Sequence, residues 1–212
     1  TGQAFIMVDN AGENSIMIYA GANNAFTPKQ VQEHQEIIEK SDFVIAQFES
    51  AIDSTIAAFK IAKKAGVKTI LNPAPALEQV PEELLNVTDM IVPNETETEI
   101  LTGIKITDEA SMRKAAEALH QLGIEAVIIT VGSKGAFYDV NGRSGIVTAF
   151  KVKAVDTTAA GDTFIGALSS ILEKDFSNLE EAIRYGNKAS SLTVQRFGAQ
   201  PSIPYQHELA DK

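Results

Sequence analysis

The segment Val155–Phe164 is the part of the sequence whose residue types and spacing are best suited to chemistry. It reads VDTTAAGDTF, and the pattern predicts a strand that passes through small residues into a helix. Small side chains let a ligand come close to the backbone, and the N–H groups at a helix start attract anions. The N–H groups of Ala160, Gly161 and Asp162 would form an anion hole for a phosphoryl group during its transfer. Asp162 would lie beside this hole as a base.

Asp162 has a second interpretation, because aspartate is favoured in the first turn of any helix. For an isolated Gly-Asp pair, helix capping is the more frequent role. Here Asp156 and Thr158 lie just upstream, and the small residues Ala159–Gly161 leave room for a ligand. This context favours the catalytic role.

The rest of the chain predicts alternating helices and strands that would position this segment. The short apolar runs 43–46, 90–92 and 126–129 lack polar alternation, which is typical of strands covered on both faces. Their alternation with helices implies a doubly wound α/β sheet with parallel pairing. Ligands of such sheets bind beyond the carboxyl ends of the strands. The expected elements are helices 29–40, 54–65, 108–122, 160–173 and 179–194, and strands 43–48, 69–71, 90–92, 126–129, 136–140 and 146–150.

Two further patterns predict β-hairpins. The strand-like runs 5–8 and 15–19 flank the polar turn Asp9–Asn14, where positive φ is accessible. Asn141-Gly142 is a favourable hairpin turn after the strand 136–140.

The composition limits the classes of protein that fit. The 212 residues are 44% hydrophobic, enough for one sizeable core, so a single domain over residues 1–212 is expected. A net charge of -10 without a basic cluster argues against nucleic acid as a partner. The absence of cysteine excludes disulfides and thiolate catalysis, and the 3 scattered histidines do not suggest a metal site. No apolar stretch is long enough for a membrane span and no signal pattern is present, so we expect a cytoplasmic protein.

Several segments together resemble the ribokinase-like, or PfkB-type, carbohydrate kinases. Asp156–Asp162 resembles the C-terminal signature of this family. Further matches occur in the expected order at Asn72–Ala76, Pro93–Glu97 and Gly198–Ser202, so the similarity extends over nearly the whole chain. The resemblance implies a ribokinase-like, mostly parallel sheet flanked by helices, with part of a small β lid at residues 3–20.

The resemblance also implies residues that bind ATP and magnesium. Asn94 and Glu97 match the family's Asn-x-x-Glu motif, with Asn94 near the ATP phosphates and Glu97 near Mg²⁺. Three residues apart on a helix, they would face the same way, although a solvated acidic first turn is the alternative. Further nucleotide contacts are implied for Asn187 and for the loop Thr130, Val131, Gly132, Ser133, Lys134 and Gly135, where a plain β-turn is the alternative.

Members of the family also carry a monovalent cation site, here expected to hold K⁺. Oxygen ligands suit such a cation, and Arg196 could offer only its backbone carbonyl. An ordinary closing loop after a helix is the alternative. The corresponding positions are Asp156, Thr158, Thr193, Arg196, Gly198 and Ser202.

For the sugar, Glu49 resembles the family residue that contacts a ribose hydroxyl, and the start of the following helix is its alternative role. The family's N-terminal Asn-x-Asp sugar contact and Gly-Gly motif do not occur here. We therefore expect an N-terminally truncated chain. The edge of a lid strand invites pairing with another chain, so we expect a homodimer for the intact protein.

The resulting hypothesis is transfer of the ATP γ-phosphoryl group to O5 of D-ribose, giving D-ribose 5-phosphate, with Asp162 as the base and with Mg²⁺ and K⁺ bound. A PfkB-type kinase for another sugar or a nucleoside is one alternative. A non-catalytic nucleotide-binding fragment is the other.

Overall fold

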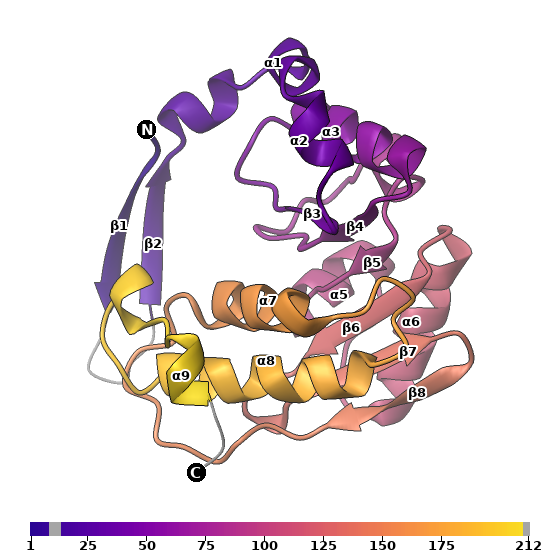
Figure 1. Ribbon diagram of the computed structural model, residues 1–212. Coiled ribbons are helices and arrows are strands. Elements are labelled where there is room, and N and C mark those ends of the chain that lie inside the picture. Colours follow the sequence, from indigo (N-terminus) through magenta and orange to yellow (C-terminus); the bar gives the residue numbers. More distant parts are fainter. Residues whose placement is uncertain (9–13, 210–212) are drawn as a thin grey trace. The chain divides into compact units, whose positions relative to one another are not determined.

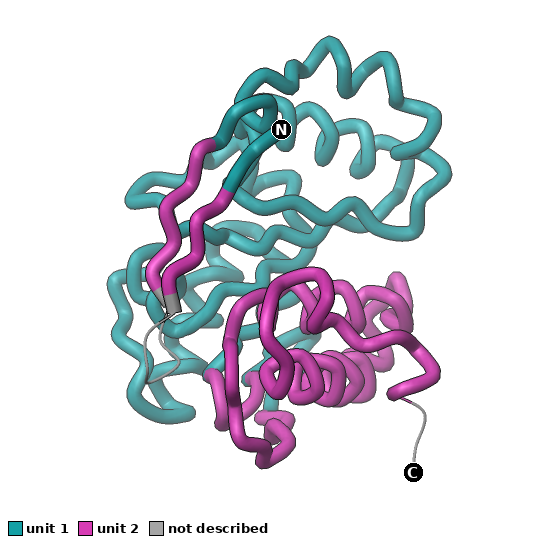
Figure 2. The backbone as a smooth tube through the Cα atoms, turned by 90° about the vertical axis from the view of Figure 1, so that its left-hand side faces the viewer, with its two compact units in different colours: residues 1–3, 20–131, 137–145 teal, residues 4–19, 132–136, 146–212 magenta. Residues whose placement is uncertain are grey.

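A computed structural model describes residues 1–8 and 14–209. Its contacts divide the chain into two compact units (Figure 2), which are treated separately below. Unit 1 comprises residues 1–3, 20–131 and 137–145, and unit 2 comprises residues 4–19, 132–136 and 146–212. The single domain predicted from length stays a prediction. Most of the expected polar turn 9–14 lies outside the described residues.

Unit 1 contains most of a six-stranded sheet with the order β3-β4-β5-β6-β7-β8 (Figure 1). The first four strands pair in parallel, with Phe43 opposite Lys68 and Met90 opposite both Ile70 and Ala126. The predicted α/β class with a mostly parallel sheet is therefore confirmed. The strands are β3 (Phe43–Ala46), β4 (Lys68–Leu71), β5 (Met90–Ile91), β6 (Ala126–Thr130), β7 (Ala136–Val140) and β8 (Arg143–Val147).

The hairpin between β7 and β8 turns at Asn141 and Gly142, which both have positive φ, 50° and 75°. This is the backbone that a two-residue hairpin needs. Strand β8 begins at Arg143, directly after the turn, and ends at Val147. The strand predicted over 146–150 was therefore placed too late.

The helices of unit 1 are α1 (Pro28–Glu33), α2 (Gln35–Glu39), α3 (Ile52–Ala65), α4 (Glu82–Leu85), α5 (Glu95–Thr102) and α6 (Glu109–Gln121). The single helix predicted over 29–40 is wrong, because His34, with φ -111° and ψ 18°, leaves the helical region. The helix predicted over 54–65 is confirmed as α3, which ends at Gly66 with φ 75°. Apolar side chains of α3, α4 and α6 form the core with those of the strands, including Phe59, Leu84, Leu119, Ile91 and Ile129.

Unit 2 contains the paired strands β1 (Gln3–Val8, from Ala4) and β2 (Asn14–Tyr19) and the helices α7 (Ala160–Ile171), α8 (Leu179–Thr193) and α9 (Gln206–Leu209). Helices α7 and α8 lie side by side (Figure 1), and Gly186 of α8 faces Phe164 of α7. A Cβ at this position would come within 2.8 Å of the Phe164 ring and 2.9 Å of its carbonyl oxygen. Glycine thus allows α8 to approach α7 closely.

Within the described part of the chain, no helix is both long and apolar enough to cross a membrane.

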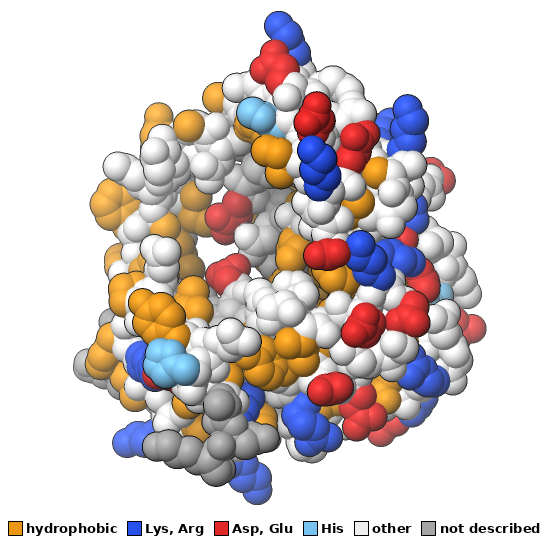
Figure 3. Space-filling view, viewed as in Figure 1, with side chains coloured by type: hydrophobic (Ala, Val, Ile, Leu, Met, Phe, Trp, Pro, Cys, Tyr) orange, Lys and Arg blue, Asp and Glu red, His pale blue; other side chains and the backbone are white. Residues whose placement is uncertain are grey.

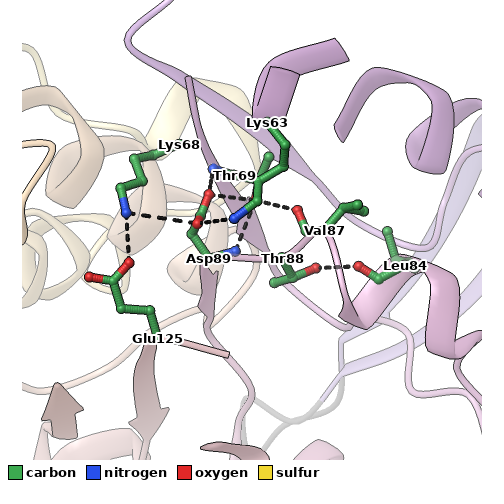
Figure 4. Close-up of polar contacts among 8 residues, drawn as sticks. All are labelled: Lys63, Lys68, Thr69, Leu84, Val87, Thr88, Asp89 and Glu125. Atoms are coloured by element: carbon green, nitrogen blue, oxygen red, sulfur yellow. Dashed lines mark hydrogen bonds and ion pairs between the residues drawn. The ribbon is translucent and has the colours of Figure 1, made fainter. Parts of the chain in front are cut away.

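Asp89, the residue before β5, connects the amino ends of three strands of unit 1 (Figure 4). Its Oδ2 accepts hydrogen bonds from the Thr69 N–H at 2.9 Å and from the Thr69 hydroxyl at 3.0 Å. Lys63 of α3 donates to the Asp89 Oδ1 at 2.6 Å. The Asp89 carbonyl accepts from the Glu125 N–H at 3.0 Å. Lys68 completes the cluster with a 2.6 Å ion pair to Glu125.

We predict that Asp89→Ala lowers the free energy of unfolding by about 2–4 kcal/mol, because it leaves the buried Thr69 N–H without its acceptor. Urea denaturation measures this change. The matched control is Glu83→Ala, which removes an exposed ion pair with Lys60 and is expected to cost less than about 1 kcal/mol. Equal losses in the two variants would contradict a structural role for the Asp89 cluster.

Candidate active site

The start of α7 is built from backbone rather than from a capping side chain. Ala159 precedes the helix in the left-handed conformation, with φ 62°, and no side chain caps the helix. Positive φ is costly for a residue with a Cβ, and such strain is concentrated at functional sites. The Ala160 N–H donates to the Thr157 carbonyl at 3.2 Å. An anion at the helix start would therefore share this N–H with the Thr157 carbonyl. Asp162 lies in the first turn and is exposed.

Asp156 fixes the loop that leads into α7. Its carboxylate is buried, and Oδ1 accepts a hydrogen bond from the Thr158 N–H and Oδ2 one from the Gly198 N–H, each at 2.9 Å. The neighbouring Thr158 hydroxyl and these N–H groups hold the pKa of Asp156 below its ordinary value of 3.8. Two segments about 40 residues apart are thereby joined within unit 2.

The remaining positions predicted for the cation site lie in the same unit. Thr193 and Ser202 are fully buried, and their hydroxyls donate to Thr163 Oγ1 at 3.1 Å and to the Ala199 carbonyl at 2.6 Å. The Arg196 side chain forms an ion pair with Glu208. Because a guanidinium has no acceptor atom, Arg196 could serve a cation only through its carbonyl.

The Thr158 hydroxyl is the one buried side-chain oxygen that makes no hydrogen bond of normal geometry within residues 1–8 and 14–209. Such an oxygen is unfavourable unless a ligand or water meets it. It lies two residues from Asp156, at the position that the sequence predicts for the cation.

In unit 1, Asn94 and Glu97 bind each other at the start of α5. The Asn94 side chain accepts from the Glu97 N–H at 2.8 Å, while Glu97 accepts from the Asn94 N–H at 2.8 Å and from Nδ2 at 2.9 Å. Together they form a capping box. Glu97 is only 7% exposed, so a freely solvated first turn does not describe it.

Burial raises the pKa of Glu97 above its ordinary value of 4.5, and the hydrogen bond from the Asn94 N–H partly opposes this rise. The carboxylate therefore pays a desolvation cost when it is charged. A cation nearby would offset that cost.

Thr130, at the end of β6, lies beside Asn94. An isolated parallel bridge joins these two residues, and the Thr130 N–H donates to the Pro93 carbonyl at 2.9 Å. Two of the predicted nucleotide positions are thus brought together at the carboxyl ends of β5 and β6, where parallel sheets bind ligands. Val131 follows and is buried.

The rest of the predicted nucleotide loop belongs to unit 2. Gly132, Ser133 and Lys134 form a short 3-10 helix and are exposed. Gly135 has φ 111°, and a Cβ there would lie 2.0 Å from the Val147 carbonyl oxygen. The need for glycine at this position is therefore explained by backbone packing, and nucleotide contact by the loop stays a prediction.

Asn187 of α8 is buried, and its Nδ2 donates to the carbonyls of Val147 at 3.0 Å and Thr148 at 3.4 Å. The amide nitrogen thus anchors the end of β8. Contact with adenine stays a prediction for this residue.

Glu49 is exposed in the turn that follows β3, and α3 begins only at Ile52. Glu49 is therefore not part of the helix that was its alternative assignment. Asn72, which also follows a strand, is hydrogen-bonded to Gln47 and to Val92. The sequence analysis gave it no role, although its position directly after β4 was a usable signal.

Comparisons with known proteins identify the family. Residues 1–206 match the model of a protein family described as pfkB family carbohydrate kinase. The ribokinase of Staphylococcus aureus (strain COL) is 53% identical over 209 residues, which are 99% of this chain and 68% of that protein. A bifunctional ribokinase/ribose-5-phosphate isomerase A of Fructilactobacillus sanfranciscensis is 54% identical over 209 residues, 99% of this chain and 38% of that protein.

A solved structure of Arabidopsis thaliana ribokinase complexed with ribose and ATP has a TM-score of 0.89 and 34% identity, and the match covers 99% of this chain and 68% of that one. The chain belongs to the pfkB family of carbohydrate kinases. The family resemblance predicted from the motifs is confirmed.

We predict that Glu97→Gln changes the pH dependence of stability. Because the folded-state pKa of Glu97 is raised, the folded state binds the Glu97 proton more tightly than the unfolded state does. This proton binding stabilises the fold at low pH, and the stabilisation is lost as pH rises above 4.5 through the folded-state pKa. The unfolding free energy of the variant minus that of the unchanged protein should therefore increase between about pH 4.5 and pH 7. Urea denaturation at several pH values measures this difference.

The control is Glu99→Gln, which changes an exposed residue on the same helix and should alter the free energy of unfolding at pH 7 by less than about 0.5 kcal/mol. If the difference in unfolding free energy between Glu97→Gln and the unchanged protein stays constant with pH, burial does not raise the pKa of Glu97.

Proposed function

We propose that this chain carries the catalytic and nucleotide-binding residues for transfer of the γ-phosphoryl group of ATP to O5 of D-ribose. The observation that supports this most strongly is 53% identity to a ribokinase over 99% of this chain. The chain spans 68% of that protein, so the activity of the whole protein is part of the proposal.

Asp162 is the proposed base. It accepts the proton of the O5 hydroxyl while that oxygen forms a bond to the γ-phosphorus, and the bond from this phosphorus to the β–γ bridging oxygen breaks to release ADP. Its exposed position in the first turn of α7 leaves the carboxylate accessible to a substrate. The N–H groups and dipole of the α7 start stabilise negative charge on the phosphoryl group, which a net charge of -10 would otherwise disfavour.

Two cations belong to the proposal. Carboxylate and amide oxygens suit Mg²⁺, and Glu97 and Asn94 present both kinds, so they would hold the ion or its waters. When bound, Mg²⁺ neutralises charge on the ATP phosphates. K⁺ would bind beside the loop into α7, where the buried Asp156 carboxylate and the neighbouring Thr158 hydroxyl, which makes no hydrogen bond of normal geometry, fit a cation.

We predict that Asp162→Asn lowers turnover by about 100-fold or more while Mg²⁺-ATP still binds, because asparagine cannot accept the hydroxyl proton. The measurement is ADP release with Mg²⁺-ATP and K⁺, with D-ribose, fructose or adenosine, together with calorimetric ATP binding. The control is Glu181→Gln, an exposed acid in the first turn of α8. It should retain turnover, and normal turnover in Asp162→Asn would refute the assignment.

A homodimer is also proposed, and it rests on the strand pair β1–β2. Hydrophobic side chains gather over these strands (Figure 3). The exposed side chains belong to both strands, and a two-stranded sheet is only marginally stable alone. They are Phe5, Ile6, Met7, Ile16, Met17, Ile18 and Tyr19, and Tyr19 is 68% exposed.

We predict that the intact protein sediments as a dimer and that Met17→Lys shifts it to a monomer, because a charge on the apolar strand opposes its burial. Sedimentation velocity measures the change. Ile37→Lys, at an equally exposed apolar residue of α2, is the control and should leave the dimer intact. A monomer for the intact protein at all concentrations would contradict the proposal.

A further inference from the structure

Asn72 lies directly after β4 and is hydrogen-bonded to both neighbouring strand ends. Its Oδ1 accepts from Gln47 Nε2 at 2.9 Å, just beyond β3. Its Nδ2 donates to the Val92 carbonyl at 2.8 Å, just beyond β5. A side chain just beyond the middle strand of three thus bridges the segments that follow the other two.

The backbone holds Asn72 in place for this bridge. Its N–H donates to the Ala46 carbonyl at 2.9 Å, and its carbonyl accepts from the Ala74 N–H at 2.8 Å. The Ala74 carbonyl in turn accepts from the Phe48 N–H at 2.8 Å. The segment after β3 is therefore tied to the segment after β4 through both main chain and side chain.

The two partners of Asn72 lead to different candidate site residues. Gln47 precedes Glu49 by two residues, on the side proposed for the sugar. Val92 precedes Asn94 by two residues, and Asn94 closes the capping box with Glu97 on the side proposed for Mg²⁺-ATP. The Asn72 amide is thus a short physical link between two groups of candidate residues within unit 1.

We propose that Asn72 is a positioning residue that sets the Glu49 segment and the Asn94–Glu97 segment at a fixed spacing. The inference rests on the proposed function, which assigns sugar and Mg²⁺-ATP to these segments. An amide is suited to the task because it accepts one hydrogen bond and donates another at the same time. Aspartate keeps the acceptor and loses the donor, whereas leucine loses both.

This chemistry allows the two arms of the link to be broken separately. Gln47→Met removes the donor to Oδ1 and leaves the bond to Val92 in place. Asn72→Asp retains an acceptor for Gln47 but directs a carboxylate oxygen at the Val92 carbonyl. The first variant should act on the sugar side and the second on the Mg²⁺-ATP side.

In steady-state kinetics, Gln47→Met is expected to raise the KM for D-ribose by about 5–10-fold, with little change in the KM for Mg²⁺-ATP. Asn72→Asp is expected to raise the KM for Mg²⁺-ATP by about tenfold, with little change in the KM for D-ribose. Asn72→Leu should raise both. Asn86→Asp, an exposed asparagine at the end of α4, is the control for added charge and should change neither.

Amide hydrogen exchange measured by mass spectrometry tests the positioning role without turnover. Without ligands, Asn72→Asp should accelerate exchange in residues 92–97 but not in 47–49, and Gln47→Met should do the reverse. If the unchanged chain releases no ADP with any sugar, the proposed function fails, and this exchange pattern still decides whether Asn72 positions the two segments. Equal acceleration of both segments by both variants, or unchanged KM values in an active enzyme, would overturn the inference.

Discussion

Strand β5 is the constraint on which unit 1 depends, because it is two residues long and lies between β4 and β6. So short a strand offers few ladder hydrogen bonds to hold its register. Polar groups at both ends of β5 supply the further hydrogen bonds that hold it in register. Asp89 binds Thr69 at the amino end, while the Val92 carbonyl accepts from Asn72 and the Pro93 carbonyl from Thr130 at the carboxyl end. The position of Asn94 follows directly from this arrangement.

Unit 2 uses the same device around a different carboxylate. Asp156 accepts from the N–H groups of Thr158 and Gly198, as Asp89 accepts from that of Thr69. A buried carboxylate is stable when several N–H groups donate to it, since charge-assisted hydrogen bonds are stronger than neutral ones. The loop before α7 can therefore be fixed even though Ala159 has an unfavourable backbone conformation. In each unit a buried carboxylate, Asp89 or Asp156, thus fixes the backbone, although the chain already carries a net charge of -10.

The sequence predicted the features that depend on local pattern. Apolar runs identified β3, β5 and β6, and β5 and β6 are buried as expected, whereas β3 is only partly covered and its Ile45 is 42% exposed. Gly66 identified the end of α3, and Asn141-Gly142 identified the hairpin turn. The break at His34 was missed because every residue around it is compatible with a helix. The start of β8 was misplaced because the hairpin turn, not the apolar run 146–150, fixes the strand register.

The candidate site was predictable only as far as motifs and strand ends reveal it. The rule that ligands lie beyond parallel strands indicates Glu49, Asn94 and Thr130. It cannot indicate that Asn187 binds Val147 or that Asn72 binds Val92, because these partners are 40 and 20 residues away in the sequence. Such contacts depend on how the elements pack, and no local pattern encodes them.

The two capping boxes at α5 and α6 show how burial separates a cap from a ligand. Asp108 at α6 is exposed, and hydrogen bonds from Ser111 hold its pKa below the ordinary value of 3.8. Glu97 at α5 makes the reciprocal bonds of a cap as well, yet burial raises its pKa. A helix cap needs no buried carboxylate, as α6 demonstrates. The desolvation of Glu97 is therefore an added cost that capping does not explain and that a bound cation would offset, which favours a role for this residue beyond the helix start.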